Sequence, residues 1–175
     1  MILRTLCLSL IAVVAACSTT MKDQSTTIYL VRHAEKAYDG TKDPDLSPKG
    51  VIRAQHLAQM MKAVPLTHIH STPYKRTRQT TNPTLKQSNI EAITPYSGSD
   101  LEDVAQFIKT TGGTHLVVGH SNTTPKLVAL LSNQPVANAL EIKENQFDLM
   151  FRVTINADGT ANHELLPYDP NFTSY

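Results

Sequence analysis

Arg32 and His33 directly follow one apolar, strand-like run, and His120 directly follows a second. Arg76 lies between the two runs. The runs are residues 28–31 and residues 116–119. A neutral imidazole is a competent nucleophile near neutral pH. A guanidinium offers planar, paired donors that match phosphate oxygens. Two histidines and two arginines on loops therefore indicate a site for phosphoryl transfer.

The composition is typical of one globular domain with an ordinary core. The chain has 175 residues, of which 41% are hydrophobic, and a formal net charge of +1. A net charge so close to zero argues against nucleic acid as a partner, because proteins that bind nucleic acid usually carry a basic face. The local arginines point instead to a small anion.

The first residues have the pattern of an export signal. Arg4 precedes an apolar run over residues 6–16 that is too short to span a bilayer as a helix. The run ends in Val-Ala-Ala-Cys, which resembles a bacterial lipobox, and Cys17 would be the lipidated residue. We therefore expect a signal peptide over 1–16, a polar linker over 17–25 and a domain over 26–175.

This reading places the protein outside the cytoplasm, anchored by lipid in the cell envelope. Ser18 after the cysteine favours the periplasmic side of the outer membrane. The alternative is a plain signal peptide with a chance cysteine. No disulfide within the mature chain is expected, because Cys7 lies inside the signal and Cys17 is then alone.

From Thr26 onward, strand patterns alternate with amphipathic helices, which predicts an α/β fold. We expect a three-layer α/β/α sandwich with a mostly parallel sheet and a C-terminal β-hairpin at its edge. The strands after the first are expected at residues 67–71, 90–94 and 114–118, and the hairpin pairs residues 147–155 with 161–166.

The helix starts are predicted from caps and prolines. Ser47 and Pro48 begin one helix, whose buried face is expected to hold Val51, Ala54, Leu57, Ala58 and Met61. Thr72 and Pro73 begin the next, and Pro83 should bend or divide it. Ser99 to Glu102 has capping-box spacing, and Thr124 with Pro125 begins a last helix.

In open α/β sheets, ligands bind beyond the carboxyl ends of the strands. His33 and His120 can therefore meet, although they are far apart in the sequence. The helix N-termini after the second and fourth strands would add backbone N–H donors to the same place.

The chain resembles the histidine phosphatase superfamily, the phosphoglycerate-mutase-like proteins, over almost its whole length beyond the linker. Residues 30–36, Leu-Val-Arg-His-Ala-Glu-Lys, are similar to the family's Arg-His-Gly motif. Residues 46–50 lead into a helix as the family's next segment does. Residues 71–80 resemble its Ser-Ser-Pro-x-x-Arg-x-x-Gln-Thr, and residues 118–121 its second-histidine motif.

The resemblance implies that His33 becomes a transient phosphohistidine, that Arg32 and Arg76 bind the phosphoryl oxygens, and that His120 stabilises the developing charge. It implies no metal or other cofactor. The usual acidic partner that protonates the leaving oxygen is not evident at its family position. We expect Asp100 in that role, with Glu102 or no dedicated acid as the alternatives.

The sequence therefore predicts an exported, metal-independent phosphatase for a phosphorylated small molecule or phosphoprotein. The alternative is a non-catalytic, anion-binding envelope lipoprotein. A metal face on His68 and His70 is a more distant reading. Three further side chains are expected to be solvated, although the loop that holds the first could gate the site: Asp43, Arg53 and Arg78.

Overall fold

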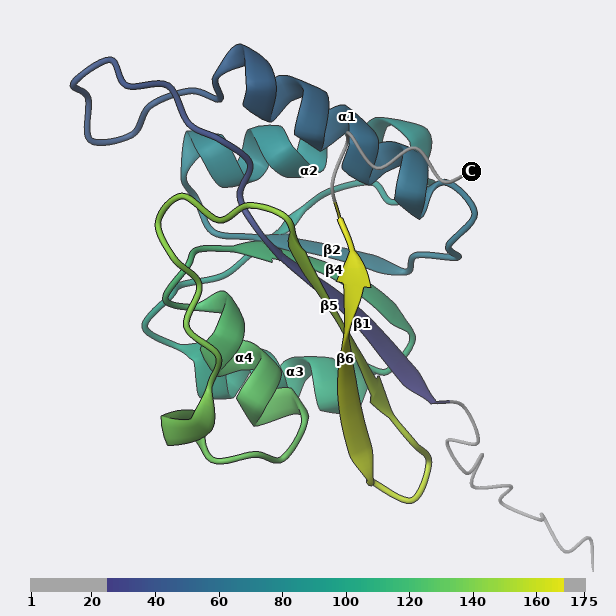
Figure 1. The fold of residues 1–175 in the computed structure, drawn as a ribbon. Helices are drawn as coiled ribbons and strands as arrows, with labels where there is room; N and C mark the ends of the chain where they lie inside the picture. Colours follow the sequence, from purple (N-terminus) through teal and green to yellow (C-terminus); the bar gives the residue numbers. More distant parts are fainter. Residues whose placement is uncertain (1–24, 169–175) are drawn as a thin grey trace, which may run out of the picture.

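The computed structural model describes residues 25–168 as one mixed sheet of six strands with helices on both faces. The predicted signal peptide, Cys17 and most of the predicted linker lie outside these residues. The strand order is β3-β2-β4-β1-β5-β6. Helices α1 and α2 cover one face, and α3 and α4 cover the other (Figure 1). The three-layer, mostly parallel α/β fold is confirmed.

The element bounds in chain order are β1 Thr26–Arg32, α1 Pro48–Met61, β2 His68–Ser71, α2 Lys75–Gln87, β3 Thr94–Pro95, α3 Leu101–Thr111, β4 Thr114–Gly119, α4 Thr124–Leu131, the 3-10 turn η1 Val136–Asn138, β5 Leu149–Ile155 and β6 Ala161–Pro167. Strands β1, β2, β3 and β4 pair in parallel, and β5 and β6 pair antiparallel at one edge. The predicted C-terminal hairpin is therefore present.

Period-two burial along the central strands builds two cores. Ile28 and Leu30 of β1 pack toward α3 and α4, whereas Val31 packs toward α1. Because both faces are covered, these strands read as continuous apolar runs. The buried strands fix the positions of the segments that leave their carboxyl ends.

Helix α1 begins as predicted, but one turn of its buried face differs. Ser47 accepts a hydrogen bond from Gly50 N, and Pro48 occupies the first turn. Val51, which was expected to be buried, is exposed. Arg53, which was expected to be solvated, is buried and donates two hydrogen bonds to Glu35 at 2.9 and 2.8 Å. A hydrophobic pattern cannot predict the burial of a charged residue whose ion-pair partner lies on another element.

Two other local predictions were wrong, and one of the two alternatives for Pro83 is excluded. The third strand was expected over residues 90–94, but β3 consists only of Thr94–Pro95, which pair with the end of β2. Pro83 does not divide its helix, since α2 continues through it. Ser99 does not cap α3, whose N-cap is Asp100 with no side-chain capping bond.

Candidate active site

The carboxyl ends of three parallel strands meet at one edge of the sheet. Arg32 pairs with Gly119 across β1 and β4, and His33 N donates to Gly119 O at 2.9 Å. They open into a cavity of about 980 Å³. Its lining includes the four residues that the sequence singled out for phosphoryl binding and transfer: Arg32, His33, Arg76 and His120. The predicted convergence of these side chains is present.

Gly119 allows the second histidine to approach this edge. A Cβ on Gly119 would lie 2.6 Å from Tyr96 Oη and 2.9 Å from Thr124 Oγ1. The hydroxyls of Tyr96 and Thr123 therefore pack directly against backbone, and Thr123 Oγ1 accepts a hydrogen bond from His120 N at 3.0 Å. A side chain at residue 119 would displace His120.

The imidazole of His33 is held in one tautomer. Its Nδ1 lies 2.8 Å from Ala34 O, and a carbonyl oxygen only accepts, so Nδ1 carries the proton. Nε2 then has a free lone pair. Burial, with positive charge on Arg32 and Arg76, lowers the pKa of His33 to about 3. The ring is therefore neutral and nucleophilic at pH 7.

His120 is fixed through a hydroxyl relay. The hydroxyl of Thr72 donates to Thr77 Oγ1 at 3.0 Å, so it accepts from His120 Nε2 at 2.8 Å. The rings of His120 and His33 lie edge to face with centroids 5.3 Å apart. Burial, followed by the charges of the two arginines, lowers the pKa of His120 to about 4. Thr72 therefore positions the second histidine rather than capping a helix.

Helix α2 begins two residues later than predicted, and its cap comes from a distant loop. Its N-cap, Tyr74, makes no side-chain capping bond. Instead, both oxygens of Asp43 accept from Lys75 N, at 3.0 and 3.2 Å. Asp43 also accepts from Arg76 Nη1 at 3.4 Å. The prediction of a solvated Asp43 was therefore wrong, because the carboxylate stabilises the helix N-terminus that carries Arg76.

Two more residues of the same motif connect α2 to the loops around His33. Thr80 Oγ1 accepts from Ala34 N at 3.0 Å and donates to Arg76 O at 2.7 Å. Gln79 accepts from Leu46 N and donates to Asp45, both at 2.7 Å. These bonds fix the helix turn that carries Arg76 relative to the segment that carries His33. They explain why an arginine is followed by glutamine and threonine at this spacing.

Arg32 is held by a segment that the sequence did not mark as functional. Its Nη1 donates to the carbonyl oxygens of Lys143, Glu144 and Gln146 at 2.9 to 3.1 Å. Its Nη2 donates to the carboxylate of Glu144 at 2.9 Å, and its guanidinium carbon lies 4.2 Å from the centroid of the Phe147 ring. No periodic or capping signal distinguishes residues 143–147, so only the folded chain identifies them.

One donor on each arginine has no acceptor among the described residues. Both Nε–H groups, of Arg32 and Arg76, are buried and lack a hydrogen-bond partner there. Buried guanidinium donors are costly to leave unpaired. Arg32 and Arg76 both line the cavity, so an anion bound there would lie beside two guanidinium groups.

The predicted proton donor lies beside the cavity but not among its lining residues. Asp100 is exposed at the start of α3 and accepts from Ser99 Oγ at 2.8 Å. Glu102 follows it in the first turn of α3. Neither is in the lining, although Ser97 and Ser99 are. The role of Asp100 stays a prediction.

Among the described residues, no cluster of three or more His, Cys, Asp or Glu side chains could hold a metal ion. His68 and His70 instead stack with His115, at ring centroid distances of 4.6 and 5.2 Å from it. His115 Nε2 donates to Gly112 O at 2.8 Å, so its Nδ1 accepts from His70 Nε2 at 3.0 Å. These rings pack between β2, β4 and α3 as a structural cluster.

Residues 28–96 match the sequence model of the histidine phosphatase superfamily (branch 1), the segment that holds Arg32, His33 and Arg76. Over this segment the chain is similar to that superfamily. A phosphoserine phosphatase 1 of Hydrogenobacter thermophilus is 40% identical over 72 residues, which cover 38% of this chain. They cover 34% of that enzyme, so the chain matches about a third of its relative's length.

Solved structures share the fold over most of the chain. The protein histidine phosphatase SixA, complexed with tungstate, superimposes with a TM-score of 0.66 at 17% identity, covering 82% of this chain and 97% of that one. The alpha-ribazole phosphatase of Shigella flexneri gives 0.65 at 14% identity, covering 85% and 99%. A mycobacterial glucosyl-3-phosphoglycerate phosphatase gives 0.63 at 12% identity, covering 83% and 100%.

Proposed function

We propose that this protein hydrolyses a phosphomonoester through a phosphohistidine formed on His33. The observation that carries the proposal is the set of unpaired groups in one cavity. The free Nε2 lone pair of a neutral His33 lies in a cavity that is also lined by Arg32 and Arg76, each of which has an unpartnered Nε–H donor. A nucleophile beside converging donors is the arrangement that phosphoryl transfer requires.

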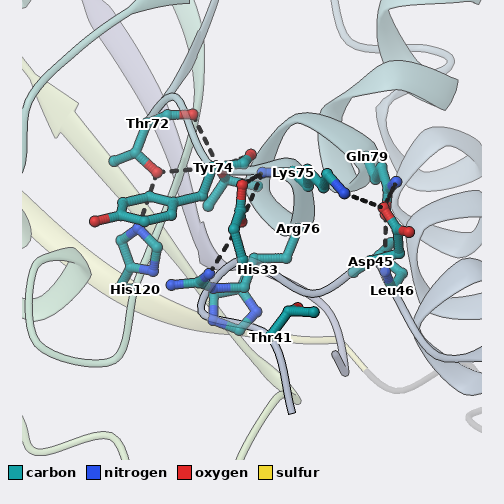
Figure 2. A network of polar contacts seen from close by, with 12 residues as sticks. His33, Thr41, Asp45, Leu46, Thr72, Tyr74, Lys75, Arg76, Gln79 and His120 are labelled. Atoms are coloured by element: carbon teal, nitrogen blue, oxygen red, sulfur yellow. Dashed lines mark hydrogen bonds and ion pairs between the residues drawn. The ribbon is translucent and has the colours of Figure 1, made fainter. Parts of the chain in front are cut away.

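The four residues divide the work by chemistry. His33 Nε2 attacks phosphorus. Arg32 and Arg76 bind the phosphoryl oxygens with charge-assisted hydrogen bonds, which strengthen as negative charge develops on those oxygens. His120 stabilises the same charge from the other side of the pocket. Its Nε2–H donates to Thr72, and its second ring nitrogen faces Arg76 and His33 (Figure 2). A bound dianion raises the pKa of His120, so that second nitrogen takes a proton and donates it in a hydrogen bond to the phosphoryl group.

The width of the cavity favours hydrolysis over mutase chemistry. A mutase must keep its phosphorylated intermediate away from water, whereas this cavity opens between exposed residues of the loops after β2 and β3. Relatives named phosphoserine phosphatase and protein histidine phosphatase support both a small phosphomonoester and a phosphoprotein as substrate classes.

The test is turnover of an aryl phosphate by the full chain and by His33→Ala. The wild type should release phosphate with EDTA present, and brief reaction with ³²P-labelled substrate should leave an alkali-stable, acid-labile label. His33→Ala should lose both while keeping its melting temperature. A folded wild type that binds phosphate but never turns over would support the alternative, an anion-binding envelope lipoprotein.

We also propose that Cys17 carries a lipid that holds the protein in the cell envelope. No described helix is long and apolar enough to cross a bilayer. The motif at residues 14–17 and the polar linker support attachment by acyl chains, of which several are needed for stable anchoring. Labelled fatty acid should enter the wild type but not Cys17→Ser. A wild type without label would overturn the proposal.

A further inference from the structure

Glu144 is the one carboxylate among the residues that line the active-site cavity. It lies in the segment between α4 and β5, five residues before β5 begins, and its side chain is 80% exposed. The sequence pointed to Asp100 or Glu102, near α3, as the proton donor and did not single out Glu144. The fold brings it to the opposite side of the same pocket.

The carboxylate of Glu144 is attached to the groups that flank both histidines. Oε2 accepts from Arg32 Nη2 at 2.9 Å, and Arg32 directly precedes His33. Oε1 accepts from Ser121 Oγ at 2.8 Å, and Ser121 directly follows His120. We propose that Glu144 is the general acid and base of the reaction, donating a proton to the leaving oxygen and later accepting one from water. This inference rests on the proposed phosphatase function.

Substrate binding itself would prepare this acid. In the structure, the Ser121 hydroxyl and the Arg32 charge hold the pKa of Glu144 below its ordinary value. A phosphoryl dianion that binds Arg32 competes with the carboxylate for the same guanidinium. It removes the cation that stabilises the ionised form and adds a like charge nearby, so Glu144 gains a proton as it is displaced. Its exposed side chain is free to move, while its backbone carbonyl stays bonded to Arg32 Nη1.

The neighbouring carboxylates are less suited to this task. Asp43 uses both oxygens on Lys75 N and does not line the cavity. Asp100 accepts from Ser99 and is also absent from the lining. Glu35 is committed to Arg53 through two short bonds.

The two half-reactions balance. In the first, the bond from His33 Nε2 to phosphorus forms, the bond from phosphorus to the leaving oxygen breaks, and Glu144 gives its proton to that oxygen. In the second, a water oxygen attacks phosphorus, the phosphorus–nitrogen bond breaks, and Glu144 takes the water proton. Phosphate leaves, and Glu144 releases that proton to solvent, which replaces the one it took up on substrate binding, and returns to Arg32 as a carboxylate.

The experiment compares leaving groups in Glu144→Gln of the full chain. A nitrophenolate leaves without a proton, whereas an alkoxide needs one. We therefore expect the variant to lose about 10²- to 10⁴-fold in kcat/KM on an alkyl phosphate. It should lose little in the first turnover of p-nitrophenyl phosphate. That first turnover should appear as a burst of nitrophenolate followed by slow steady-state release, with labelled phosphohistidine accumulating.

Two further variants complete the design. Glu141→Gln removes the same charge from an exposed residue of the same segment outside the cavity, and it should behave as the wild type. Asp100→Asn tests the rival acid. Glutamine keeps one acceptor oxygen for Arg32, and its amide N–H can donate to Ser121 Oγ. Because the site is exposed, we expect the variant to keep its fold, and a melting curve checks this.

The inference is overturned if Glu144→Gln loses the same factor on both substrates without a burst, since Glu144 would then only position Arg32. It is also overturned if Asp100→Asn, and not Glu144→Gln, shows the dependence on leaving group. A wild type that fails to hydrolyse either ester refutes the proposed phosphatase function itself, which is a separate result.

Discussion

A methyl group on Gly50 should separate helix α1 from the segment that carries His33, the proposed nucleophile. A Cβ there would lie 2.1 Å from Glu35 O and 3.0 Å from the Glu35 carbonyl carbon and nitrogen. All three are backbone atoms, so no side-chain rotation relieves the overlap. Ordinary contact begins at 3.4 Å, so the first turn of α1 and residue 35 must move apart by about 1.3 Å.

That movement acts on both stability and rate. Ser47 N donates to the same Glu35 O at 2.8 Å, so the bond that fixes α1 to this segment is stretched. Overpacking of this kind costs about 1–3 kcal/mol. His33 lies two residues before Glu35, and a displacement near 1 Å in a reacting group costs about 10²-fold in rate. We expect Gly50→Ala to lose about 10²-fold in kcat on an aryl phosphate.

The measurement is steady-state hydrolysis together with a thermal melt. Val51→Ala is the matched control, because Val51 is the next residue of the same helix and is exposed. It should keep its rate, and its free energy of unfolding should change by less than about 0.5 kcal/mol. A Gly50→Ala protein with the rate and melting temperature of the wild type would refute the argument that α1 positions His33 through this contact.

Three other predictions concern the charged and titrating groups. Arg76→Lys should lose about 10²- to 10³-fold in kcat/KM because an ammonium cannot reproduce the guanidinium fork, whereas exposed Arg78→Lys should be nearly silent; equal losses in parallel assays would contradict this. Because the pKa of His33 is about 3, the acid limb of kcat/KM, corrected for substrate ionisation, should fall below about pH 4 rather than near 6.5; a midpoint near 6.5 would disprove it. Burial also lowers the pKa of His70 to about 3, so His70 stays neutral in the folded protein while the unfolded chain takes up a proton below about pH 6.5. The free energy of unfolding is therefore highest above about pH 6.5. It falls by up to about 1.4 kcal/mol per pH unit as the pH drops toward about 3. Urea unfolding of His70→Leu should show a shallower pH slope than the wild type, and an unchanged slope would count against it.

Local signals predicted the central elements well. Strand β1, strand β4 and the start of α1 follow from apolar runs and from the Ser47-Pro48 cap, because these features act within a few residues. Signals failed where long-range contacts replaced local ones. Tyr74 has no capping side chain, and Asp43 caps α2 from 32 residues away. Most of the segment expected as a strand at residues 90–94 pairs with no neighbour. Only its last residue and Pro95 pair with β2 at the sheet edge.

The sequence by itself indicated the chemistry that is proposed for this protein. The types and order of Arg32, His33, Arg76 and His120, each at a strand end or helix start, indicated phosphoryl transfer because parallel strands bring their carboxyl ends to one edge. Only the tertiary structure decided which groups surround them. The hydrogen bonds of Glu144 to Arg32 and Ser121 join residues that are more than 20 positions apart, and no periodicity or capping pattern encodes such a contact. It exists because packing of the loop before β5 over the strand ends brings that carboxylate to the arginine.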